Sequence, residues 1–229
     1  MRLHYHGLAA LALTLLLCGC GALDVRRPVG VQVVNLSADV PALSVRVDGQ
    51  EVVVTARTHQ PTLAYQQAST ELQLNPGLHR IEVVADGVSL LSYSQTFVEG
   101  RHASLQVLGR TSASAAAQSL AWLVAQRVTE PDGDHAGLRF SHALVGYGAV
   151  SVEVEPAGAA AQTVASSLAY GAASSDDALL VPRGAVRLRV RQGETLIWDQ
   201  AYQLDAGVVY NFALSGAAQA PTVVSWSGA

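Results

Sequence analysis

Residues 44–48 read Ser-Val-Arg-Val-Asp, and residues 151–155 read Ser-Val-Glu-Val-Glu. Both stretches place valine at every second position and polar side chains between the valines. Successive side chains of a β-strand point to opposite faces of the sheet, so this pattern predicts strands with one buried face. Residues 80–83 and 187–191 repeat the alternation, and no stretch after residue 30 shows a sustained helical period. The sequence therefore predicts an all-β protein.

The chain contains two similar halves. The two opening stretches lie 107 residues apart, and the same shift superimposes glycines and apolar residues along each half. A two-residue slip also matches Leu-Ala-Tyr at 63–65 to Leu-Ala-Tyr at 168–170. A period of about 100 residues is far longer than that of a solenoid repeat and indicates duplicated domains. The matched positions include Val45 and Val152, Gly77 and Gly184, Gly100 and Gly207, and Val107 and Leu214.

Each half has the pattern of a β-sandwich. Glycine and proline recur at roughly ten-residue intervals, which is typical of about seven or eight short strands in two packed sheets. We expect two tandem immunoglobulin-like β-sandwich domains, at residues 30–128 and 137–229, joined by a polar linker at 129–136. The Cys…Trp…Cys core of antibody domains is absent, so this likeness concerns architecture only. Trp122 and Trp226 lie on the expected closing strands, at places expected to be equivalent.

The amino-terminal segment carries the features of an export signal. Arg2 precedes a continuous apolar run at residues 8–17. This run is about half of the ~20 residues needed to cross a membrane, and it fits the apolar region of a secretory signal peptide, here residues 1–19. Residues 17–20, Leu-Cys-Gly-Cys, resemble the bacterial lipobox. The resemblance implies cleavage just before Cys20 and attachment of lipid to its sulfur.

A second observation supports lipidation of Cys20. No cysteine follows it, and an unpaired thiol in an oxidising compartment is a liability that lipidation removes. The alternative is an ordinary cleaved signal in which Cys20 is incidental. With the lipid, residues 20–29 form a tether that reaches at most about 30 Å. The first domain is then expected near the bilayer, and the second farther out, where a partner meets it.

The residue after Cys20 bears on the location. By resemblance to the sorting rule of enteric bacteria, Gly21 in place of aspartate implies the outer membrane. We therefore expect a lipid-anchored protein of the bacterial cell envelope that faces the periplasm or the cell surface.

Charge and composition exclude one class of partner. The formal net charge is −4, the chain has no lysine, and its arginines are scattered. A nucleic-acid surface needs a clustered basic face, so no nucleic-acid partner is expected. We also expect no metal and no cofactor. The histidines after the signal peptide show no ligand spacing; they are His59, His79, His102, His135 and His142.

Residues 34–49 resemble the opening of the bacterial family catalogued as domain of unknown function 4397 (DUF4397). Its members commonly begin with a strand, a His-Ala-Ser-Pro-Asp-Ala-Pro-like turn, a Val-rich strand and an Asp-Gly turn. Asn35 occupies the place of the histidine, while the second half keeps His142 and Ala143 but has lost the rest of the turn. The resemblance implies two tandem sandwich domains on an exported protein, often a lipoprotein, with no established activity.

Catalytic motifs are missing from the sequence. It has no Gly-x-Ser-x-Gly nucleophile elbow, no phosphate-binding loop and no His-Glu-x-x-His pattern. Asp39 is expected to fix a turn through nearby backbone amides, and His142 to flank a strand end. Three acids alternate on the linker in the manner of Ca²⁺ ligands but lack the glycine and closing glutamate of an EF-hand loop, so a solvated linker is favoured. These acids are Glu130, Asp132 and Asp134.

We therefore expect a non-enzymatic, membrane-anchored envelope lipoprotein, a binding or structural module whose partner is an envelope protein or a glycan. Two alternatives stay open from sequence. One is an envelope hydrolase or carbohydrate-binding protein with a site on sandwich loops or at the domain junction, around Asp132, Asp134, His135 and His142. The other is a structural spacer that binds nothing.

Overall fold

The computed structural model describes residues 27–55, 61–112, 119–127 and 130–228. The predicted signal peptide, Cys20 and His59 lie outside these residues. The described chain folds into eighteen strands in four sheets. Within this part of the chain, no helix is long and apolar enough to cross a membrane. The all-β prediction is confirmed.

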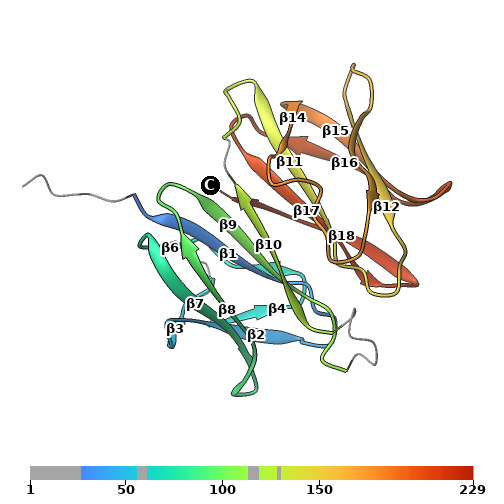
Figure 1. The fold of residues 1–229 in the computed structure, drawn as a ribbon. Helices are drawn as coiled ribbons and strands as arrows, with labels where there is room; N and C mark the ends of the chain where they lie inside the picture. Colours follow the sequence, from blue (N-terminus) through green and yellow to red (C-terminus); the bar gives the residue numbers. More distant parts are fainter. Residues whose placement is uncertain (1–26, 56–60, 113–118, 128–129, 229) are drawn as a thin grey trace, which may run out of the picture.

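The first ten strands form a two-layered sandwich, which we call unit 1 (Figure 1). They span Val29–Asn35 (β1), Ala42–Val47 (β2), Gln50–Val52 (β3), Thr62–Ala64 (β4), Gln67–Ala68 (β5), Leu72–Leu74 (β6), Gly77–Ala85 (β7), Val88–Phe97 (β8), His102–Leu108 (β9) and Ala121–Arg127 (β10). The inner sheet of unit 1 has the order β10-β9-β1-β5, with β6 also paired to β1. Its outer sheet has the order β3-β2-β7-β8, with β4 also paired to β2.

The last eight strands form a second sandwich, unit 2. They span His135–His142 (β11), Val150–Pro156 (β12), Gln162–Leu168 (β13), Leu179–Pro182 (β14), Gly184–Gln192 (β15), Thr195–Leu204 (β16), Val209–Ala217 (β17) and Ala220–Gly228 (β18). The inner sheet has the order β14-β11-β17-β18, and the outer sheet β13-β12-β15-β16. In both units the first strand pairs in parallel with the second-to-last, β1 with β9 and β11 with β17.

The two-layered architecture is the one predicted, with a particular strand order. Lettered along the chain, the sheets of unit 2 read D-A-G-H and C-B-E-F, whereas immunoglobulin constant domains pair strands ABED and CFG. Unit 1 has more strands than predicted because turns divide residues 50–74 into four short strands. At one of these turns Gln66 has a φ of 64°.

Each sandwich closes over its own apolar core. Val45 on β2 and Val152 on β12 are fully buried between the sheets, as the alternation predicted. In unit 2 the rings of Tyr202 and Phe212 meet edge to face at 4.9 Å between centroids. The aromatic residues expected in the cores all pack there; they are Tyr93, Phe97, Trp198, Tyr202, Tyr210 and Phe212.

The inner sheets of the two units pack against each other, so the molecule is a stack of four sheets (Figure 1). Six of the seven residues of β9 and seven of the eight residues of β11 are buried. A sheet with one solvated face would bury only alternate side chains, so both faces of these strands are covered. A third apolar cluster joins the units, with Val34, Leu36 and Leu108 from unit 1 and Ala143, Ala213 and Trp226 from unit 2.

Equivalent residues of the two units meet at the same height of this junction. The strand register places Gln32 beside Ser104 in unit 1, and Arg139 beside Asn211 in unit 2. The second pair is the first shifted by 107 residues. All four residues line one crevice between the units.

The next level along the strands has the same symmetry. The Ser141 hydroxyl donates to Gln106 Oε1 across the junction at 2.7 Å. The equivalent pair from the opposite units, Val34 and Ala213, lies in the shared apolar cluster. The units are therefore related by an approximate two-fold axis parallel to the strands, and β1 and β11 run in the same direction.

This arrangement contradicts the expectation that the second domain lies beyond the first. β10 runs antiparallel to β9, and its last residue, Arg127, pairs with His102. The chain thus returns to the end at which β1 begins before it enters unit 2. The units therefore lie side by side, with the starts of β1 and β11 at the same end.

Trp122 and Trp226 do not occupy equivalent places, contrary to expectation. Trp122 pairs with Val107 and packs on the core of unit 1, 6.4 Å from the ring of Tyr93. Trp226 pairs with Asn211 and is buried at the junction. The two tryptophans are 104 residues apart, three fewer than the general shift of 107. An odd offset along a strand moves a side chain to the other face of the sheet.

Candidate functional site at the junction of the two units

Asp39 fixes a loop of unit 1. Its carboxylate accepts hydrogen bonds from the backbone amides of Thr111 and Ser112, both at 3.1 Å, and from their hydroxyls at 2.8 and 3.0 Å. Burial raises the pKa of this carboxyl, but the hydrogen bonds outweigh burial and hold the pKa at about 2. The sequence predicted a role through nearby backbone amides, and the structure corrects the place, because these amides are more than 70 residues away.

Asn35 and His142 occupy equivalent positions and make equivalent contacts. Asn35 Oδ1 accepts from the amide two residues on at 3.2 Å, and Nδ2 donates to the Val40 carbonyl at 2.9 Å. His142 Nδ1 accepts from the amide two residues on at 3.3 Å, and Nε2 donates to the Gly148 carbonyl at 3.0 Å. Burial lowers the pKa of His142, and the bond to Gly148 offsets this only in part. Both side chains therefore stabilise the turn after the first strand of their unit.

The residues of the alternative hydrolase site do not come together. The Asp132 carboxylate accepts from the amides of Asp134 and His135 at 3.0 Å and lies 2.7 Å from His135 Nδ1, which forms one local turn. His142 is buried seven residues farther along β11, about 23 Å away at ~3.3 Å per residue. The prediction of a hydrolase site built on these four residues is therefore wrong. No group of three or more His, Cys, Asp or Glu side chains in the described chain could hold a metal.

A narrow crevice lies between the inner sheets at the end where both units begin. Gly30, Gln32, Glu71, His102 and Ser104 line it from unit 1, and Arg139, Val209, Asn211 and Gly228 from unit 2. Its volume is about 20 Å³, enough for about one or two water-sized groups. The crevice is the place where polar side chains of both units converge.

Glu71 and His102 form a hydrogen-bonded pair at the mouth of this crevice. His102 Nδ1 lies 2.5 Å from Glu71 Oε1, and the two side chains are 29% and 13% exposed. A Cβ at Gly30 would overlap both the Glu71 carboxylate and His102 Nδ1, so the pair needs glycine at this position. Because Nδ1 bonds to the carboxylate, Nε2 is the ring nitrogen that remains to accept from a ligand.

Two nearly buried polar residues lie deeper in the crevice. Ser104 is 5% exposed, and its hydroxyl has no hydrogen-bond partner in the described chain. A buried hydroxyl without a partner costs about 1–3 kcal/mol. Arg139 is 4% exposed and donates from its guanidinium to the backbone carbonyls of Ser175, at 3.3 Å, and Asp176. The crevice thus combines an oriented imidazole, a carboxylate and an unsatisfied hydroxyl.

Sequence reasoning missed this site. Glu71 and His102 are 31 residues apart and belong to no motif. Ser104 and Arg139 alternate with apolar neighbours. From sequence alone this pattern predicts a solvent-exposed face, because it does not reveal that a second sheet covers the strands. One signal was present in the alignment of the halves, where Glu71 and His102 fall opposite apolar residues.

At the opposite end of the stack, loops of the two units join across the junction. The Tyr65 hydroxyl lies 3.1 Å from Ser215 Oγ and accepts from the amide of Gly216 at 2.9 Å. Tyr170, its counterpart in unit 2, packs on the shared apolar cluster. Burial raises the pKa of Tyr170, and the charge of Arg110 in unit 1 partly offsets this. Each unit therefore contributes one tyrosine to this end of the junction.

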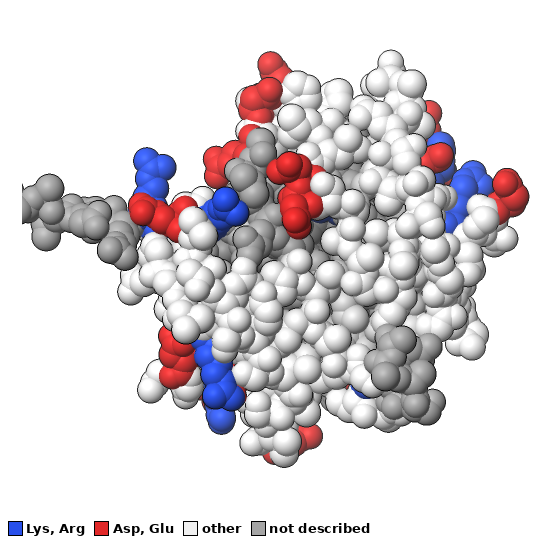
Figure 2. All heavy atoms as spheres, viewed as in Figure 1, with Lys and Arg blue, Asp and Glu red and all other residues white. Residues whose placement is uncertain are grey.

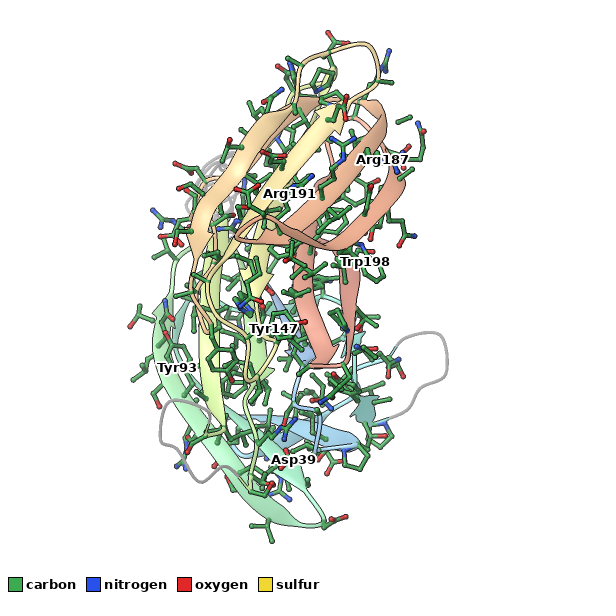
Figure 3. The ribbon with its side chains drawn as sticks, turned by 90° about the vertical axis from the view of Figure 1, so that its right-hand side faces the viewer. Asp39, Tyr93, Tyr147, Arg187, Arg191 and Trp198 are labelled. Atoms are coloured by element: carbon green, nitrogen blue, oxygen red, sulfur yellow. The ribbon has the colours of Figure 1, made fainter. Side chains whose placement is uncertain are left out.

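The outer sheet of unit 2 carries arginines that acids of the same sheet neutralise. Arg187 contacts Asp199 through two nitrogens at 2.6 and 2.9 Å, and Arg189 contacts Glu155 at 2.7 Å. Figure 3 shows Arg187 at one end of the molecule and Asp39 at the other, with Tyr147 between them. In Figure 2 large areas of the visible face carry no charged side chains.

Comparisons with known proteins identify the family and add little on activity. The family model described as "Domain of unknown function (DUF4397)" matches residues 29–153, which include all strands of unit 1 and continue into β11 and β12 of unit 2. No curated protein matches the chain. Among the solved structures that resemble it, two are described as candidate cell-adhesion proteins. The one from Bacteroides ovatus is 14% identical, with a TM-score of 0.26, over 88% of this chain and 96% of the other. The one from Bacteroides uniformis is 10% identical, with a TM-score of 0.25, over 88% and 98%.

Proposed function

This chain belongs to the DUF4397 family, and on that premise we propose that it is a non-enzymatic, lipid-anchored protein of the bacterial cell envelope. In this proposal unit 2 is a second copy of the family domain, and the pair binds an envelope partner at the end away from the anchor. The second copy is supported by the strand order that the units share and by the matching contacts of Asn35 and His142.

The anchor is supported by the lipobox-like residues 17–20 and by Cys20, which has no later cysteine to pair with. β1 begins at Val29, at the same end of the stack as the crevice. Lipid on Cys20 would hold this end toward the membrane. The loops at the opposite end would then point into the periplasm or away from the cell.

The observation that carries the proposal is the way in which these far loops are held. The Tyr65 hydroxyl of unit 1 hydrogen-bonds to the Ser215 side chain and the Gly216 amide of unit 2. Asp39 holds a neighbouring loop through hydrogen bonds from Thr111. Loops on a rigid scaffold are where binding residues are commonly found. Loops of two units that are bonded to each other would present their exposed residues together, which suits recognition of a macromolecule.

The apolar junction supports the same proposal because it stops the units from moving separately. Domains joined by a small polar interface usually change their relative orientation. Here Leu36, Leu108 and Trp226 are buried between the inner sheets. The pair therefore behaves as one body, and a partner meets a surface of fixed shape.

Site-specific photo-crosslinking in the host envelope tests the proposal. A photoreactive residue is placed at Ala38 or Ala169, which are exposed on far loops of units 1 and 2, and at exposed Ser94 on the outer sheet as a matched control. We expect covalent adducts from Ala38 and Ala169 in the membrane fraction, and none from Ser94. Adducts from Ser94 alone, or from no position, would show that the far loops bind nothing.

A further inference from the structure

The two units provide an internal comparison at the crevice. Gly30 and Gly137 are equivalent in the 107-residue shift, and an added Cβ at either position would collide with two side chains. The colliding side chains occupy equivalent positions as well. They are Glu71 and His102 at Gly30, and Ala178 and Val209 at Gly137.

The fold can be packed at this place without a carboxylate and an imidazole. Unit 2 fills it with Ala178 and Val209, and Val209 is 1% exposed. Unit 1 instead keeps a carboxylate and an imidazole that are largely removed from solvent. A partly buried pair of this kind adds little net stability, because the loss of solvation offsets much of the attraction. Stability of the sandwich therefore does not explain why unit 1 has Glu71 and His102 at these positions.

A second observation marks the same crevice as a place for a ligand. The Ser104 hydroxyl lines it, is nearly buried and has no partner in the described chain. Native proteins seldom leave such a group unpaired unless water or a ligand meets it. Asn211 of unit 2 lines the crevice beside it and is 7% exposed.

We infer that this crevice binds hydroxyl groups on the edge of a sugar ring. A hydroxyl both donates and accepts hydrogen bonds. The Glu71 carboxylate and His102 Nε2 accept, while the Ser104 hydroxyl and the Asn211 amide can do either. The volume of about 20 Å³ admits one or two hydroxyls and excludes a whole ring, so the ligand is bound by its edge.

The inference goes beyond the proposed function, because the crevice lies at the anchor end of the stack and the proposed partner surface at the other. The two sites share no residue. Their failures can therefore be told apart.

The experiment probes the full-length chain, solubilised in detergent, on an array of immobilised bacterial and synthetic glycans. Two variants are compared with the wild type. Glu71→Ala/His102→Val installs the residue types that unit 2 uses at the equivalent place. Ser104→Ala removes a hydroxyl that the fold leaves unpaired, so it should not lower the melting temperature.

We expect the wild type to bind a subset of glycans and both variants to bind them at least about tenfold more weakly, with melting temperatures unchanged or raised. Absence of any glycan signal would overturn the inference and leave the crevice as a water site. Glycan binding that both variants retain would also overturn it, and would assign recognition to the far loops. Should the double variant unfold, the Ser104→Ala result decides alone.

Discussion

The equivalent glycines of the two units, Gly30 and Gly137, should respond differently to substitution by alanine. A Cβ at Gly30 overlaps the ends of two flexible, partly exposed side chains, Glu71 and His102, which can rotate away. Their separation forfeits a hydrogen bond of about 0.5–1.5 kcal/mol, and alanine in a strand regains about 0.5–1 kcal/mol relative to glycine. We expect Gly30→Ala to leave the free energy of unfolding within about 1 kcal/mol of the wild type, although its overlap is the closer one.

Gly137→Ala is the matched control, and it should be the more damaging change. Its Cβ would lie 2.9 Å from Ala178 Cβ and Val209 Cγ2 and 3.2 Å from Pro131 Cγ. The Cβ of Ala178 is fixed to its own backbone and cannot rotate away, so the main chain must shift. Overpacking of this kind costs about 1–3 kcal/mol, and the strand preference of alanine leaves a net loss of about 1–2 kcal/mol.

Urea unfolding followed by tryptophan fluorescence measures both variants. A loss above about 2 kcal/mol for Gly30→Ala, or a larger loss than for Gly137→Ala, would refute the reasoning. The same Gly30→Ala variant tests the crevice, because displacement of Glu71 and His102 should abolish glycan binding while the chain stays folded.

Three further predictions concern residues outside the crevice. Asp39→Asn removes a carboxylate whose pKa is held at about 2 by hydrogen bonds from Thr111 and Ser112. Because solvent screening weakens these bonds, the substitution should lower the free energy of unfolding by about 1 kcal/mol at neutral pH. That cost should vanish as the pH falls through about 2 in acid titrations of the unfolding midpoint. Burial lowers the pKa of His79, but its bonds to a carboxylate and a backbone carbonyl outweigh burial and raise the pKa above the ordinary value of 6.5. The stabilisation by His79 should therefore be complete below that value and disappear as the pH rises through the folded pKa, which urea midpoints of wild type and His79→Gln from about pH 5 to 8 would show. Cys20→Ala should move the protein from the membrane fraction to the soluble fraction and end labelling by radioactive fatty acid, and membrane retention with continued labelling would contradict the anchor.

The strands that the sequence predicted best are those of the outer sheets. Val45 and Val47 on β2, and Val152 on β12, face a core on one side, with polar neighbours on the other. This is the environment that produces a period of two in the sequence. Because each outer sheet borders only one core, its register could be predicted without knowledge of any other part of the chain.

The inner sheets could not be predicted in the same way, since their second face is covered by the other unit. Gln106 and Ser141 alternate with apolar residues as though they faced water, yet they hydrogen-bond to each other across the junction. Alternation reports which face of a strand is more polar and does not distinguish a solvated face from a polar interface. The side-by-side packing of the units, and with it the crevice, was therefore out of reach of local patterns.

A comparison of the two units distinguishes the residue types that the fold requires from those that it does not. Asn35 and His142 differ in chemistry but make the same pair of backbone contacts, so the fold needs a side chain that accepts and donates at this position. Glu71 and Ala178 share a position and no chemistry, so the fold needs only to fill the space there.

The place of the crevice restricts what it could bind. Its wall includes Gly30, one residue after β1 begins. With lipid on Cys20, the nine residues that follow it, up to Val29, would keep this end within about 30 Å of the bilayer. Soluble sugars would reach the crevice only by diffusion, whereas glycans carried at the membrane surface would be concentrated beside it. We therefore expect the sugar to belong to a surface glycan, and the array should show stronger signals from membrane-derived bacterial glycans than from oligosaccharides of other origin.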